Sequence, residues 1–246
     1  MVNESGDQAV KSGEAAEGIS GGFLQSIVDI FIDPIKVFRR IDAGLAWWKP
    51  FILISVISII LGYLMVPITR HVTMLNESGV AEEQLETVVS FMEKGYWAAP
   101  VAVILGLLIV AAIAHLMIKI ISPHSNFVKT LSLIAYCKLI YVVKDILYVV
   151  ILRMKPLEDI ESQADAQVSL SLSALFPDAG KYFSAFLENL GVFQIWYYIL
   201  VIIGIATIFK MDRKKAVIPT LVLWVVILLG SFISIFFQGF GSRGMG

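Results

Sequence analysis

Long apolar stretches separated by shorter polar segments dominate the chain. An α-helix needs about 20 mostly apolar residues to cross a hydrocarbon layer about 30 Å thick. Five stretches reach or approach this length, and only the third carries several charges in its interior. They comprise residues 50–68, 98–121, 127–152, 192–210 and 216–238. The pattern predicts an all-α fold, a polytopic membrane helix bundle with five transmembrane helices.

A different periodicity precedes the first of these stretches, in residues 23–49. Asp33 followed by Pro34 favours a helix start, because aspartate is a good N-cap and proline fits the first turn. The apolar face of the helix that follows consists of Ile35, Phe38 and Ile41. Its basic face consists of Lys36, Arg39 and Arg40. This arrangement is typical of interfacial amphipathic helices, whose apolar side enters the acyl boundary while the basic side meets anionic headgroups.

The two ends of the chain lack such patterning. Residues 1–22 are acidic and rich in glycine and serine, which predicts a disordered cytoplasmic tail and not a secretory signal. Residues 239–246 form a short tail. Its string GFGSRG matches a nucleotide-binding glycine pattern, but such a site needs a preceding strand and a following helix. We therefore expect no cofactor there.

The composition supports a membrane location. Hydrophobic residues make up 58% of the chain and charged residues 16%, with a mean hydropathy of +0.82. A soluble domain is typically about 45–50% apolar and about 25% charged. A water-soluble domain of this size could not hide so much apolar surface, because its outer shell must face water.

The basic residues near the ends of the predicted spans set the orientation. Cytoplasmic loops of membrane proteins carry an excess of lysine and arginine. The densest cluster, KMDRKK at 210–215, contains the proposed topology anchor, Lys210, Arg213, Lys214 and Lys215. This cluster and the basic N-terminal flank share one side only if 127–152 crosses the membrane. We therefore expect a cytoplasmic N-terminus and a C-terminus outside.

The third predicted span contains charges, which are costly at bilayer depth and need partners or water. At 3.6 residues per turn, one face is shared by Lys138, Tyr141, Asp145 and Tyr148. Lys144 lies about 100° round from Asp145. His115 in the second span could face the same interior, although a hydrogen-bonded packing role fits it better than a proton relay. These residues form either a polar pathway or ligand site, or a structural stripe that pairs with neighbouring helices. The sequence leaves both interpretations open.

Several kinds of chemistry are not expected. The net charge of −1 offers no basic field for nucleic acid, and the three histidines lack the spacing of metal ligands. Cys137 is the only cysteine. No nucleophile has an identifiable base, and neither a G-x-S-x-G nor an H-E-x-x-H motif occurs. We expect no catalytic residue, no cofactor and no metal, and hence no enzyme.

Three stretches together resemble the Yip1 domain family, in particular its prokaryotic branch. They are DPIKVFRRID with WWKPFILIS at 33–55, HLMIKIISPHSNFVKTLSLIAYCKLIY at 115–141, and LGVFQIWYYILVIIGIATIFKMDRKKAVIPTLVLW at 190–224. The resemblance implies five transmembrane helices, a cytoplasmic N-terminus and the inner (plasma) membrane of a bacterium. Two features depart from the family pattern. ISPHSNF replaces a glycine-rich turn, and the Asp-Leu-Tyr-Gly-Pro element of the eukaryotic branch is absent, so the Rab-GTPase association of that branch is not carried over.

Two functional hypotheses follow. The leading one is a non-enzymatic membrane scaffold, adaptor or membrane-organising component whose partners are the lipid bilayer and other membrane proteins or copies of itself. The alternative is a small transporter or channel subunit that uses the polar face of the third span.

Overall fold

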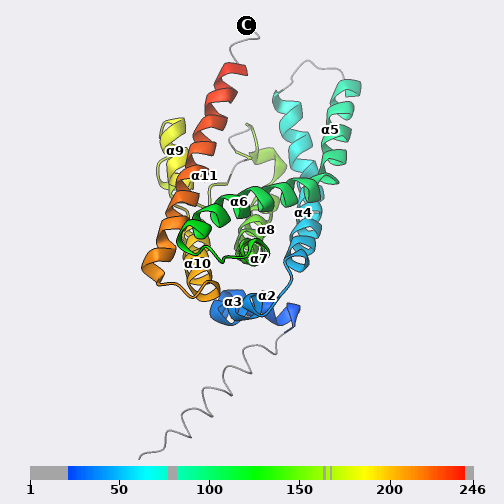
Figure 1. The fold of residues 1–246 in the computed structure, drawn as a ribbon. Helices are drawn as coiled ribbons and strands as arrows, with labels where there is room; N and C mark the ends of the chain where they lie inside the picture. The colour runs from blue at the N-terminus through cyan, green and yellow to red at the C-terminus, as the bar shows by residue number, and fades with distance from the viewer. Residues whose placement is uncertain (1–21, 77–81, 163–164, 167, 242–246) are drawn as a thin grey trace, which may run out of the picture. The chain divides into compact units, whose positions relative to one another are not determined.

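The computed structural model of the chain describes residues 22–76, 82–162, 165–166 and 168–241. These residues form helices and connecting segments without a strand, which confirms the predicted all-α class (Figure 1). The helices are α2 (Phe23–Ile32), α3 (Pro34–Asp42), α4 (Trp48–Asn76), α5 (Glu82–Tyr96), α6 (Ala99–Ile121), α7 (Phe127–Cys137), α8 (Leu139–Met154), η1 (Leu157–Asp159), η2 (Leu172–Leu175), α9 (Lys181–Glu188), α10 (Val192–Ile208) and α11 (Arg213–Gly241).

The described residues fall into two compact units. Unit 1 comprises residues 22–50, 107–139 and 198–223, and unit 2 comprises 51–106, 140–197 and 224–241. The predicted tail at 1–22 lies outside the described residues except for Gly22. The predicted tail at 239–246 begins inside α11, which continues to Gly241.

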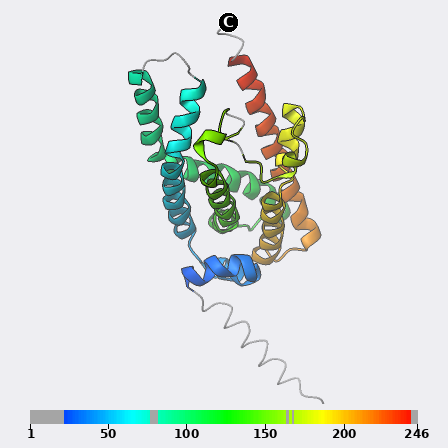
Figure 2. The same cartoon turned by 180° about the vertical axis from the view of Figure 1, so that it is seen from behind.

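Unit 1 is built around the short helices α2 and α3, which pack on each other and on α7. Both cartoon views show α2 and α3 side by side in blue (Figures 1 and 2). Phe38 on α3 is fully buried, and it lies against Gly204 of α10 together with Leu133 of α7. A Cβ atom added at Gly204 would lie 3.1 Å from the Phe38 ring and closer still to Leu133. The missing side chain of Gly204 therefore allows three helices to meet in this core.

In unit 2, α4 and α5 lie side by side in both cartoon views (Figures 1 and 2). A Cβ atom at Gly62 would be 2.5 Å from the Tyr96 ring, so the glycine permits that ring to approach α4. Arg70 and Glu86 face each other across the pair at 3.6 Å. These contacts join α5, which lies between the first two predicted spans, to α4.

A second core in unit 2 joins the C-terminal part of α4 to α8 and the segment after it. Ile68, Leu152 and Ile160 form a buried apolar cluster. Next to it, Nε2 of His71 lies 3.0 Å from the carbonyl oxygen of Ile160, a contact in which the ring nitrogen donates. These contacts explain why α4 extends beyond the predicted end at residue 68 to Asn76, since the added turns pack on protein.

Three helices in the described part of the chain are long and apolar enough to cross a membrane. They are Trp48–Leu75, Ala99–Ile121 and Arg213–Phe237. A fourth arises if α9 and α10, which meet at a bend of 49°, count as one span. The predicted third span is divided at Lys138 into α7 and α8, with 11 and 16 residues. The predicted number of five spans is therefore not confirmed and stays a prediction.

The long apolar helices carry large exposed apolar side chains. On α4, Ile52, Val56 and Ile60 recur at every fourth position and are all exposed. In the most apolar window of each of the three long helices, between 11% and 22% of the residues are buried inside the protein. Exposed stripes of this size suit a lipid environment, because water would have to solvate several hundred Å² of hydrocarbon.

Candidate functional site

A buried ion pair joins the two N-terminal helices of unit 1. Nη1 of Arg40 on α3 donates to Oδ2 of Asp29 on α2 at 2.6 Å and to the Ser26 hydroxyl at 3.1 Å. Nε2 of Gln25 donates to the other carboxylate oxygen of Asp29 at 3.1 Å. The side chains of Arg40 and Asp29 are only 5% and 9% exposed. Burial of two charges is tolerated here because each of them has a partner and further hydrogen bonds.

The polar contacts turn α2 into a helix with its apolar side outward. Ser26, Asp29 and Ile30 face the interior, whereas Leu24, Val28 and Ile32 are 77%, 51% and 78% exposed. Leu24, Val28 and Ile32 are called here the α2 stripe, and their spacing of four places them along one side of the helix. A helix in water normally presents the opposite pattern.

The structure corrects two sequence-based predictions about α3. Arg40 was predicted to face headgroups with Lys36 and Arg39, but it points inward to Asp29. Phe38 and Ile41 were predicted to enter the acyl boundary, but both are buried within the protein. Sequence alone could not reveal this, since Asp29 lies 11 residues before Arg40 and meets it only when α2 folds onto α3.

Two exposed cations remain on α3. Lys36 forms a weak, exposed ion pair with Asp33 at 3.4 Å, and Arg39 is exposed. At the end of α3, Nζ of Lys129 on α7 donates to Asp42 at 2.5 Å. The Asn126 side chain caps α7 by accepting from the backbone N–H groups of the second and third following residues. The α2–α3 pair is thereby tied to a well-capped helix.

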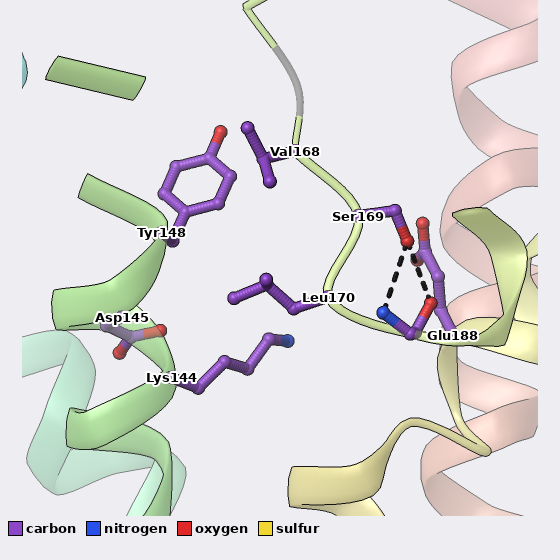
Figure 3. Close-up of a pocket in the computed structure, with 8 residues that line it drawn as sticks. Lys144, Asp145, Tyr148, Val168, Ser169, Leu170 and Glu188 are labelled. Carbon is purple, nitrogen blue, oxygen red and sulfur yellow. Dashed lines mark hydrogen bonds between the residues drawn. The ribbon is translucent and has the colours of Figure 1, made fainter. Parts of the chain in front are cut away.

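Unit 2 contains a polar cavity of about 290 Å³. Figure 3 shows that one wall comes from α8 and the other from the segment before η2 together with the end of α9. The lining residues are Lys144, Asp145, Tyr148, Val168, Ser169, Leu170, Ser171 and Glu188. Three of them, Lys144, Asp145 and Tyr148, belong to the polar residues that the sequence singles out.

Charged and hydroxyl groups gather around this cavity. Lys144 is half-buried and extends from α8 toward the opposite wall, where Glu188 lies (Figure 3). Among the described residues, Lys144 forms no ion pair within 4.0 Å. The hydroxyls of Ser169, Ser171 and Ser173 form a closed set of hydrogen bonds of 2.6 to 2.9 Å.

The segment that forms the second wall is anchored by hydrogen bonds. The hydroxyl of Tyr148 donates to the carbonyl oxygen of Ala166 at 3.2 Å, and Nζ of Lys155 donates to that of Asp165 at 3.1 Å. The Ser162 hydroxyl donates to the Asp165 carboxylate at 2.7 Å and lowers the pKa of that exposed group. These bonds attach the connecting segment to α8 and to the residue that follows it, Lys155.

The remaining predicted polar residues lie elsewhere. Lys138 occupies the break between α7 and α8, where its backbone N–H donates to the carbonyl oxygen of Ile134. The ring of Tyr141 packs on Tyr197 with centroids 5.0 Å apart. In unit 1, Nδ1 of His115 lies 3.2 Å from the Thr130 hydroxyl and its ring meets Phe127 edge-on. The packing role expected for His115 fits these contacts.

The four residues of the topology anchor are exposed. Lys210, in the turn between α10 and α11, has a left-handed backbone with φ of 51°. The other members, Arg213, Lys214 and Lys215, lie in the first turn of α11. The carboxylate of Asp212 accepts from the backbone N–H of Lys214 at 3.1 Å and so caps this helix.

Sequence reasoning missed the second wall of the cavity. Ser169, Ser171 and Glu188 lie between the third and fourth predicted spans, where the sequence analysis names no site residue. One available signal was the alternation in SLSLS at 169–173, since alternate residues of an extended segment share a side. No such local signal connects Glu188 to Lys144. Within the described residues, no group of three or more histidine, cysteine, aspartate or glutamate side chains could hold a metal ion.

Comparison with known proteins gives two matches. The family model of the Yip1 domain matches residues 28–235. "Membrane protein YknW" of Bacillus subtilis (strain 168) is 24% identical to the chain over 213 residues, which cover 85% of this chain and 89% of that protein. No solved structure matches the chain.

Proposed function

The chain belongs to the Yip1 domain family, and we propose that it acts in the membrane as a non-enzymatic scaffold, adaptor or membrane-organising protein. The proposal rests on the α2 stripe. Its residues Leu24, Val28 and Ile32 present a continuous apolar edge, while the polar side of the same helix is occupied by the buried pair of Arg40 and Asp29. The absence of a catalytic motif from the sequence supports a non-enzymatic role.

We place the α2–α3 pair at the cytoplasmic membrane surface. Removing a leucine, valine or isoleucine side chain from water contributes about 1.5–3 kcal/mol. Each cation near an anionic surface contributes about 1 kcal/mol, and the exposed Lys36 and Arg39 are suited to that contact. With these contacts, the α2–α3 pair would hold the start of the first span at a defined depth in the membrane. The α2 stripe would then be available to bind other membrane components.

The proposed topology has five spans, at about 50–68, 98–121, 127–152, 192–210 and 216–238, after interfacial helices at 23–49. The N-terminus is cytoplasmic and the C-terminus outside, in the inner membrane of a bacterium. The exposed anchor residues Lys210 and Arg213 support the cytoplasmic position of the α10–α11 turn. The proposed partners are lipids and other membrane proteins or further copies of the chain, and they include neither nucleic acid nor metal.

The test is capture of the full chain from cross-linked native membranes, followed by identification of co-purifying proteins and measurement of particle mass. The expected result is a defined partner or a self-associated form that is lost in the variant Leu24→Glu/Val28→Glu/Ile32→Glu. Lys181→Gln, at an exposed position on α9, is the surface control. Recovery of a monomer without any partner protein would contradict the scaffold proposal.

The alternative, a small transporter or channel subunit, draws support from one observation. Lys144 and Asp145, two of the predicted intramembrane polar residues, both line the cavity of unit 2. Under this alternative, Lys138→Gln and Asp145→Asn abolish a transport phenotype while the protein remains inserted at normal abundance. If the substitutions lower only the abundance, the polar face is structural and the scaffold function is favoured.

A further inference from the structure

Lys144 is a half-buried residue whose side chain projects into the cavity of unit 2 and forms no ion pair among the described residues. A lysine side chain that is partly removed from water gains by contact with an anion, because burial penalises an unpaired charge. The hydroxyls of Ser169 and Ser171 on the far wall already donate within their closed set with Ser173, so they can only accept a further hydrogen bond, and the Lys144 ammonium is the group left to meet an anion. One part of the cavity is therefore suited to a phosphate or a carboxylate.

The opposite charge lines the same cavity. Asp145 on α8 and Glu188 at the end of α9 are both exposed at its rim, so the charged lining is one cation and two carboxylates. A simple anion meets repulsion from the two carboxylates, and a simple cation meets repulsion from Lys144. A molecule that carries both an ammonium and an anionic group satisfies both sets of charges.

We propose that this cavity binds a small zwitterion, with its anionic phosphate or carboxylate at Lys144 and its primary ammonium at Glu188. The apolar side chains of Val168 and Leu170 also line the cavity and would contact the carbon atoms of the ligand. The ammonium also donates to the serine hydroxyls. This site is independent of the scaffold function, because the α2 stripe belongs to unit 1 and the cavity to unit 2.

The size of the cavity restricts the ligand. Its volume of about 290 Å³ is at the small end of the range of about 300–1,000 Å³ found for ligand pockets. A phosphoethanolamine headgroup and a free amino acid share the required chemistry at this size. The first would come from a membrane lipid and the second from solution.

The proposal is tested with the full chain purified in a detergent free of ethanolamine lipids, by calorimetric titration with four soluble probes. Glycerophosphoethanolamine represents the lipid headgroup and glycine the free amino acid. Ethylamine and glycerol phosphate carry the two charges separately. The expected result is that at least one zwitterion binds at least about tenfold more tightly than both single-charge probes, a difference of about 1.4 kcal/mol. Tighter binding of glycerophosphoethanolamine identifies a lipid headgroup site, and tighter binding of glycine identifies a site for a free amino acid.

Two charge-neutralising variants locate the binding. Lys144→Gln and Glu188→Gln are each expected to weaken binding of the preferred zwitterion about tenfold or more, since each removes a charge-assisted contact. Lys181→Gln and Asp178→Asn remove exposed charges outside the cavity lining and are expected to leave binding unchanged. Equal binding of ethylamine or glycerol phosphate to the unmodified protein, or unchanged affinity in both cavity variants, would overturn the proposal. The comparison of the four probes uses the unmodified protein, so it tests zwitterion binding even if a variant fails to fold.

Discussion

Arg40 of α3 and Asp29 of α2 form a buried ion pair with 2.6 Å between Nη1 and Oδ2. This contact fixes which side of α2 faces inward and therefore which side carries the exposed α2 stripe. The ion pair is thus the structural cause of the surface on which the scaffold proposal depends.

Breaking this pair by removing one partner should be strongly destabilising. Arg40→Met leaves the Asp29 carboxylate buried without its cation, which typically costs about 3–5 kcal/mol. The double variant Arg40→Met/Asp29→Leu removes both charges and should recover most of that loss. Thermal unfolding of the purified protein in detergent measures the difference, with Arg39→Met on the exposed side of α3 as control. Equal stability of Arg40→Met and Arg39→Met would show that the pair contributes nothing.

The ion pair between Lys129 and Asp42 should behave differently. Its side chains are 35% and 31% exposed, so water and salt screen the attraction. Lys129→Gln should reduce the stability of the protein by only about 0.2–1 kcal/mol. The reduction should shrink further when unfolding is measured at high salt. A salt-independent loss as large as that of Arg40→Met would mean that this contact is effectively buried.

Gly204 should not tolerate a side chain. A Cβ atom there would collide with Leu133 and press on Phe38, both of which are fully buried and cannot move aside without cost. Gly204→Ala should therefore lower thermal stability by about 1–3 kcal/mol, the usual range for overpacking. Gly230→Ala on α11 is the matched control, since a Cβ atom there meets nothing within 4 Å. If both variants melt alike, the close approach of α3, α7 and α10 does not limit stability.

The third predicted span can be tested by cysteine labelling. Cys137, the only cysteine, is fully buried and should resist maleimide in the folded protein, so Cys137→Ala provides a background. If the segment crosses the membrane, Glu158→Cys reacts with an impermeant maleimide on intact cells. His124→Cys then reacts only after lysis. Both positions are exposed, which makes the reagent's access depend on the membrane alone. Labelling of both on intact cells, or of neither, would contradict the five-span topology.

Local features of the sequence determine the helical character of the chain. The length of each apolar run limits where a membrane helix can lie, and α6 (Ala99–Ile121) begins one residue after the predicted start at 98. Asp33 and Pro34 mark the start of α3 through the local rules of helix initiation. Such features depend only on residues that are close in the sequence, so they can be predicted without knowledge of the tertiary structure.

The tertiary structure decides what each helix face meets. Arg40 turns inward because the folding of α2 onto α3 places Asp29 and Ser26 beside it, and no periodicity distinguishes it from the exposed Arg39. Lys144 and Glu188 line one cavity because the segment before η2 returns to α8. The sequence by itself therefore determines an all-helical chain suited to a membrane. Which charges are buried, and which enclose a cavity, depends on contacts between distant segments that helical periodicity does not encode.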